Sequence, residues 1–306
     1  MGAKTKFGVI TITLLSLIIF SGCTTQSQSS LEISSADSVS IENTEAPSVE
    51  RVISLANGSA EIISALGLKK IIVGRDVAST EEDLKQIPVV TSGHQVIAEK
   101  IISLNPDLVI IDKSTGPQNA IAAIRTAGIR VVETPEAWTL AEIEPKITAI
   151  AAAIGVTKDG AILNAKMFSK LSPSSDPNSG VRAAFLYLRS SSAIYLIGGK
   201  GSGADSLLGA IGAVDVGAQK LDLPFTAMTS EAIAALNPEV IFVMTKGLAS
   251  TGGVDGLVAL PGVAQTDAGK NRRIIAVDDS LMLSFGPRTP NLILQMSNAL
   301  AKVMKS

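Results

Sequence analysis

A segment that occurs twice in the chain sets the first limit on its fold. Residues 101–111 (IISLNPDLVII) and 233–243 (IAALNPEVIFV) both contain a helix end, an Asn-Pro stop, an acidic residue and an apolar strand. A looser pair, residues 61–67 and 205–212, occurs in the same order. Two matches in the same order predict two structurally related lobes.

Strand-like and helix-like stretches alternate in both halves of the chain. Residues 51–55, 108–112 and 240–244 are mostly apolar without alternation, which is typical of strands buried on both faces of a parallel sheet. The sequence therefore predicts an α/β fold with two doubly wound lobes, parallel sheets and a single long interlobe helix. We expect that helix over residues 157–171, followed by a Pro/Ser/Asn-rich loop at 172–180.

The first 23 residues predict the compartment. Lys4 and Lys6 precede an apolar run over residues 7–20, and Ser21-Gly22-Cys23 follows, which is the pattern of a signal peptide with a small-residue cleavage site. Cys23 is the only cysteine in the sequence, and its position resembles that of the lipidated cysteine in bacterial lipoproteins. The alternative is ordinary cleavage that leaves a free thiol. We expect an extracytoplasmic protein that is anchored to the cell membrane by lipid on Cys23.

Composition predicts the domain boundaries. Residues 1–22 form the signal peptide, and residues 23–49 are rich in Ser, Thr, Gln and Glu, which predicts a flexible tether. We expect an N-terminal lobe over 50–138, an interlobe helical linker over 139–180 and a C-terminal lobe over 181–306.

Charge and motifs argue against several functions. The net charge is -2 and the basic residues form no stripe, so we expect no nucleic-acid binding. The glycine-rich segment 198–203 lacks the Gly-Lys-Ser/Thr ending of a phosphate-binding loop. We expect no enzyme, because the single histidine and the lack of a Gly-x-Ser-x-Gly elbow disfavour a serine hydrolase. A haem-dependent peroxidase and a surface adhesin or sensor domain remain alternatives.

Several segments resemble one family of binding proteins. Residues 51–68 (RVISLANGSAEIISALGL) are similar to the first-lobe opening of solute-binding proteins that serve importers of haem, cobalamin and iron-siderophores. Closer resemblance to the haem-binding lipoproteins of bacterial ABC importers is carried by residues 73–80, 195–206, 252–263 and 283–290. The resemblance implies a monomer that captures haem b and delivers it to an ABC transporter permease. A corrinoid or a ferric siderophore is the alternative ligand.

His94 and Tyr195 are the candidate axial ligands of the haem iron. His94 is the only histidine and lies in a predicted loop, and Tyr195 lies near the end of a predicted strand. In the family, one histidine and one tyrosine from opposite lobes bind the iron, and these two residues fit that arrangement. A surface histidine and a packed strand tyrosine are the alternatives. Tyr187 lies inside a predicted strand and is expected in the core.

Four charged residues are further candidates. Arg75 and Arg288 could each bind a haem propionate through the guanidinium fork, or could form structural salt bridges. Glu61 and Asp205 occupy matching places in the two lobes, each in the first turn of a predicted helix. The resemblance implies that they dock on the permease, whereas stabilisation of the helix dipole is the alternative. Trp138 is expected at the interlobe hinge or the cleft.

Overall fold

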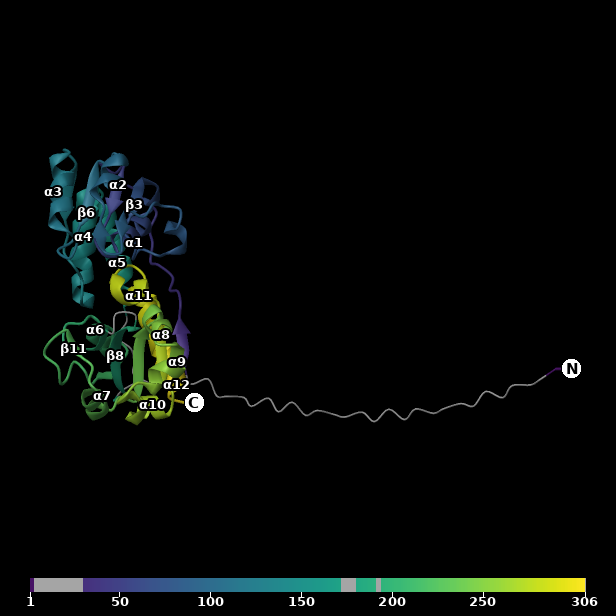
Figure 1. The fold of residues 1–306 in the computed structure, drawn as a ribbon. Coiled ribbons are helices and arrows are strands. Elements are labelled where there is room, and N and C mark those ends of the chain that lie inside the picture. Colours follow the sequence, from purple (N-terminus) through teal and green to yellow (C-terminus); the bar gives the residue numbers. More distant parts are fainter. Residues whose placement is uncertain (3–29, 172–179, 191–193, 306) are drawn as a thin grey trace.

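The computed structural model describes residues 1–2, 30–171, 180–190 and 194–305. The residues described from 30 onward form two lobes arranged end to end (Figure 1). Lobe one contains a four-stranded parallel sheet in the order β3-β2-β6-β7. A short antiparallel hairpin, β4–β5, lies in the same lobe. The strands are β2 (Val52–Ser54), β3 (Ile72–Arg75), β4 (Thr91–Ser92), β5 (Gln95–Val96), β6 (Leu108–Ile111) and β7 (Arg130–Glu133).

Lobe two contains a larger sheet in the order β1-β13-β12-β8-β9-β11, with β10 beside β8. Its strands run parallel except for β9, which lies antiparallel to both of its neighbours, β8 and the edge strand β11. The predicted α/β class with two lobes and parallel sheets is therefore confirmed, with an antiparallel edge added. The strands are β1 (Leu31–Ile33), β8 (Arg182–Arg189), β9 (Ile194–Gly198), β10 (Val214–Asp215), β11 (Phe225–Ala227), β12 (Val240–Met244) and β13 (Ile274–Val277).

Helices cover both sheets. Lobe one carries α1 (Ser59–Ala65), α2 (Ala98–Ser103) and α3 (Gln118–Thr126), with short 3₁₀ turns η1 (Lys69–Ile71) and η2 (Glu82–Leu84). The 3₁₀ turn η3 (Leu140–Glu142) leads out of it. Lobe two carries α6 (Ala204–Ala210), α7 (Ser230–Leu236), α8 (Thr245–Ser250), α9 (Gly253–Ala259), η5 (Val263–Gln265), α10 (Asp267–Lys270), α11 (Asp279–Ser284) and α12 (Thr289–Val303).

The repeated segment forms the same structure in both lobes. In lobe one α2 leads through Asn105 into β6, and in lobe two α7 leads through Asn237 into β12. The two asparagines have φ values of 44° and 39°, in the left-handed region that asparagine tolerates better than most residues. The repeated sequence therefore corresponds to two equivalent turns, each of which joins a helix to a strand.

Two helices, rather than one long helix, connect the lobes. Helix α4 (Ile143–Ile154) ends at Gly155, which has a φ of 85°, and α5 (Thr157–Phe168) folds back antiparallel to α4. A Cβ atom on Gly160 of α5 would lie 2.5 Å from the Cβ of Ala151, so the glycine permits this close packing. Asn164 Nδ2 also donates to the carbonyl oxygen of Glu144 at 3.3 Å. The expected loop at 172–180 lies outside the described residues except for its last position.

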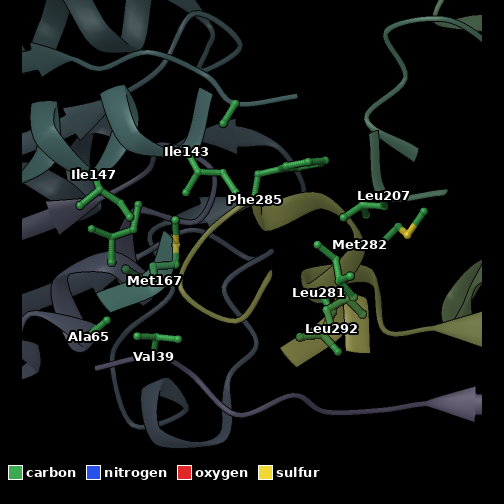
Figure 2. Packing of buried hydrophobic residues seen from close by; sticks show 14 of the residues in the cluster. Val39, Ala65, Ile143, Ile147, Met167, Leu207, Leu281, Met282, Phe285 and Leu292 are labelled. Carbon is green, nitrogen blue, oxygen red and sulfur yellow. The ribbon is translucent and has the colours of Figure 1, made fainter. Parts of the chain in front are cut away.

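The largest apolar core is continuous between the lobes. Ile143 of α4 lies close to Phe285, Ile147 of the same helix belongs to the same cluster, and Leu207 and Met282 continue it into lobe two (Figure 2). All of these side chains are buried. The segment that contains α11 therefore acts as an apolar connection between the two lobes.

Residues 30–49 contradict the predicted flexible tether. Strand β1 pairs with β13 of lobe two, and the backbone N–H of Val39 donates to the carbonyl oxygen of Pro287 at 3.0 Å. Further along, the N–H of Ser48 donates to the carbonyl oxygen of Ile154 at 2.8 Å. The segment thus runs along both lobes before it enters β2 (Figure 1).

The carboxylate of Asp159 explains much of this order. It is fully buried on α5 and accepts hydrogen bonds from Asn43 Nδ2 and from the backbone N–H groups of Thr44 and Glu45. Val39 adds a buried apolar anchor. The polar composition of the segment does not reveal these partners, because they lie more than a hundred residues away.

The membrane anchor remains a prediction. Cys23 lies outside the described residues, as does most of the predicted signal peptide. Within the part of the chain that the structure describes, no helix combines the length and hydropathy needed to span a membrane.

Candidate ligand site between the lobes

A cavity of about 490 Å³ lies between the two lobes at the carboxyl ends of their central strands. Leu55, Asp76 and Asp112 line it directly after β2, β3 and β6 of lobe one. Arg189 at the end of β8 and Lys246 after β12 line it from lobe two. Ligands of open α/β sheets bind at this edge of the strands, and the volume is within the roughly 300–1,000 Å³ of small-molecule sites.

His94 lies in a loop, as predicted, and this loop is part of the cavity lining. It follows Gly93 in the turn between β4 and β5, and its side chain is exposed. Gly93 has a φ of 56°, which suits a tight turn at glycine. The only imidazole of the chain is therefore available to a ligand in the cavity, while its bond to iron stays a prediction.

The two tyrosines lie on opposite faces of the β8–β9 pair and are not part of the cavity lining. The hydroxyl of Tyr195 shares a hydrogen bond with Ser190 Oγ at 3.1 Å, and its ring packs against an apolar cluster of lobe two. Tyr187 is half-buried rather than fully in the core. Its ring meets Phe225 edge-on, with 5.8 Å between ring centroids, and the guanidinium carbon of Arg189 lies 5.3 Å from its centroid.

Arg75 and Arg288, the residues predicted to bind propionates, are not part of the cavity lining. Both are buried, with 8% of each residue exposed. Arg75 Nε donates to the carbonyl oxygen of Leu84 at 3.0 Å, and its Nη1 donates to that of Ser79 at 2.8 Å. Arg288 Nη2 lies 3.0 Å from Glu61 Oε2 and 2.7 Å from an oxygen of Glu81. Arg288 thus forms buried ion pairs, whereas Arg75 is held by backbone carbonyl oxygens.

Glu61, the residue predicted to dock on a permease from lobe one, is buried. Only 3% of it is exposed, because Arg288 covers its carboxylate from the side of α12. Its Oε1 also accepts the backbone N–H of Arg288 at 2.7 Å. The matching position in lobe two, Asp205, is partly exposed at the start of α6. It accepts the N–H groups of Gly201 and Gly203 at 2.7 and 3.0 Å, so it already has a structural role there.

Arg189 and Lys246 were not among the site residues predicted from the sequence. Both are exposed cations in the cavity lining. Arg189 is the last residue of β8, and Lys246 follows β12 by two residues. The rule that ligands meet parallel strands at their carboxyl ends would have selected them. The backbone N–H of Lys246 donates to Asp279 Oδ2 at 3.1 Å, which joins this wall to α11.

Trp138 lies against lobe two at the interface between the lobes and is not part of the cavity lining. Its indole N–H donates to Glu136 Oε2 at 3.1 Å, and its ring lies against Gly203 of lobe two. A Cβ atom added to Gly203 would lie 3.3 Å from Trp138 Cε3. Glycine at this position therefore leaves room for the indole.

Burial shifts the pKa of three groups beside the site. Desolvation raises the pKa of Glu81 to about 7, although Arg288 acts in the opposite direction. Burial likewise raises the pKa of Asp76, which lines the cavity. Desolvation lowers the pKa of Lys146 to about 8, and its ammonium donates to the carbonyl oxygen of Ser284 at 2.6 Å. The interface between the lobes thus contains several ionisable groups removed from water.

The fold and site define a two-lobed binding protein. A family described as "Periplasmic binding protein" matches residues 52–281, so the chain belongs to this family, whose members are binding proteins rather than enzymes. Among solved structures, the haem-binding protein HmuT superposes with a TM-score of 0.81 at 34% identity, covering 88% of this chain and 97% of HmuT. HmuT has also been solved with a histidine, a tyrosine or an arginine replaced, and that arginine follows the tyrosine by two positions.

Sequence comparison adds two curated relatives. The uncharacterized ABC transporter substrate-binding lipoprotein YvrC of Bacillus subtilis is 29% identical over 247 residues, which are 78% of this chain and 76% of YvrC. The vitamin B12-binding protein of Vibrio vulnificus is 33% identical over 88 residues, which are only 28% of this chain and 32% of that protein.

Proposed function

We propose that this chain is the substrate-binding protein of an ABC importer and that its substrate is haem. The observation that carries the proposal is the interlobe cavity with His94, the only histidine of the chain, in its lining. The long similarity to a haem-binding protein at 34% identity supports haem as the ligand. The relative YvrC, named as an ABC transporter lipoprotein, supports the importer and a lipid anchor on Cys23. An ABC permease is then the partner, and we expect the binding protein to act as a monomer.

His94 is the proposed iron ligand from lobe one, and a tyrosine of lobe two is the second. The sequence prediction was Tyr195, but Tyr187 has stronger support. Tyr187-Leu188-Arg189 is the only place in this sequence where an arginine follows a tyrosine by two positions, as in the variants of HmuT. Arg189 lines the cavity and lies against the Tyr187 ring, so Tyr187 is one side chain away from the ligand. We infer that Arg189 moves aside when haem binds, so that the phenol, a known type of axial ligand for haem iron, meets the iron.

Arg189 and Lys246 are the proposed partners of the haem propionates, in place of Arg75 and Arg288. Both are exposed in the cavity lining, so their charges remain free to meet carboxylates. Arg189 offers a planar fork and Lys246 a point charge. We therefore expect the propionates to lie toward lobe two.

A corrinoid or a ferric siderophore is the second candidate. The match to the vitamin B12-binding protein favours a corrinoid, although it covers less than a third of either chain. A corrinoid needs no tyrosine ligand. The two candidates therefore differ in their dependence on Tyr187 and Tyr195.

A hemin titration followed by absorption spectroscopy tests the proposal. We expect saturable binding with a Soret shift that is weakened by at least about tenfold in His94→Ala, which is the cost of about 1.4 kcal/mol of lost ligation. Tyr187→Phe should change the Soret band and Tyr195→Phe should leave it unchanged. The reverse result would restore Tyr195 as the ligand. No binding of hemin by the wild-type protein, with saturable binding of cobalamin, would replace haem by the corrinoid.

A further inference from the structure

One wall of the cavity is a loop that carries no apolar core of its own. Residues 76–84, here called the 76–84 loop, follow β3, and Asp76, Val77 and Ala78 at its start line the cavity. Of these, Val77 is 39% exposed. Leu84 at the far end is the part of the loop that is fully buried. A loop of this kind requires polar contacts to hold one conformation.

Arg75 organises the 76–84 loop from inside lobe one. Its guanidinium donates to carbonyl oxygens at the start, middle and end of the loop, those of Asp76, Ser79 and Leu84. The carboxylate of Asp76 accepts the N–H groups of Ala78 and Ser79 at 2.9 and 3.2 Å. These bonds fix the shape of the loop but do not join it to the opposite wall.

Arg288 provides the connection to the opposite wall. Its Nη2 binds Glu81 of the loop at 2.7 Å, and Nη1 donates to Ser280 Oγ of α11 at 3.3 Å. Ser280 itself lines the cavity, as does Asp279 beside it. Glu61 of α1 holds the same arginine through both carboxylate oxygens. One buried guanidinium therefore contacts both walls of the cavity from behind.

We propose that Glu61, Arg288 and Glu81 form a brace that holds the 76–84 loop in its ligand-binding position. Arg288 and Glu81 are then positioning residues, which act on the ligand through Asp76, Val77 and Ala78. The part of this proposal that concerns haem affinity depends on the proposed function. The part that concerns the loop does not, since it rests on contacts among the protein's own side chains.

Hydrogen–deuterium exchange of the 76–84 loop, combined with hemin titration, tests the brace. In Glu81→Ala we expect exchange in the loop to rise by about fivefold or more. Hemin affinity should fall in proportion to the braced fraction that is lost, because only this fraction binds. The Soret maximum should stay where it is in wild type, since no iron ligand is removed. Arg288→Lys, which keeps the charge but loses the fork, should give a smaller increase in exchange.

Glu82→Ala is the matched control. Glu82 is the next residue in the chain, but its side chain is 84% exposed and pairs only with Lys85 among the described contacts. We expect wild-type exchange and affinity in this variant. Unchanged loop exchange in Glu81→Ala would overturn the brace, and so would a shifted Soret maximum, which would make Glu81 a ligand contact. If wild type fails to bind hemin, the haem proposal fails while loop exchange still decides the brace.

Discussion

The two walls of the cavity carry their positive charges in different places. Beside the 76–84 loop the cations are buried: Arg75 and Arg288 are each 8% exposed and are bound by carbonyl oxygens or carboxylates of the protein. On the lobe-two wall Arg189 and Lys246 are exposed in the cavity lining. A buried cation is held by groups that have lost their water, and it cannot turn to a ligand without leaving those groups unpaired. The comparison teaches that exposure, rather than residue type, separates a structural arginine from one that can bind a carboxylate.

The largest expected effect is on the buried side. Arg288→Ala should lower the free energy of unfolding by about 3–5 kcal/mol at about pH 8, because two buried carboxylates, Glu61 and Glu81, lose their cation. Urea denaturation followed by circular dichroism measures this loss. Arg189→Ala is the control from the opposite wall and should stay within about 0.5 kcal/mol of wild type. A loss below about 1 kcal/mol in Arg288→Ala would mean that the buried cluster contributes no more than a surface pair.

A second effect on the buried side depends on pH. The pKa of Glu81 is raised from 4.5 to about 7 mainly by desolvation, so the folded protein binds a proton that the unfolded chain releases between these values. The contribution of the Glu81 carboxyl group to the free energy of unfolding is therefore fully present below about pH 4.5. It is lost as the pH rises through about 7. The charged groups that face it are Arg288, Glu61 and Asp76, and Asp278 acts on Arg288.

Comparison with Glu81→Gln isolates this contribution. We expect the free energy of unfolding of wild type, relative to that of Glu81→Gln, to fall by about 2 kcal/mol between about pH 5 and pH 8. This fall is smaller than the full pKa shift implies, because the Glu81 side chain keeps some exposure to water. Urea denaturation at several pH values measures the difference. Glu82→Gln, at an exposed neighbour, should show no such trend. A difference that rises with pH would show that Glu81 is ionised and stabilised by Arg288.

The same contrast explains what could be predicted from the sequence. The two lobes and their Asn-Pro turns follow from local patterns, and the position of His94 follows from a loop between apolar segments. The burial of Arg288 could not be predicted, because its partner Glu81 lies 207 residues away in the chain. Order in residues 30–49 was missed for the same reason, since the partner of Thr44 is Asp159. Distant polar pairing leaves no periodic signal, whereas strands and helices do.

The smallest expected effect is on hemin binding by the exposed cations of the lobe-two wall. Arg189→Ala should weaken hemin binding by about tenfold and Lys246→Ala by somewhat less, because a guanidinium fork holds a carboxylate through two bonds. Isothermal titration or Soret titration measures both affinities. Arg189→Lys should recover part of the loss. Since exposed charges are screened by salt, the difference in hemin affinity between wild type and Arg189→Ala should become smaller between low salt and about 0.5 M NaCl. An affinity that is unchanged in both variants would move the propionates away from lobe two, and the exposed cations would then have no role in selecting the ligand.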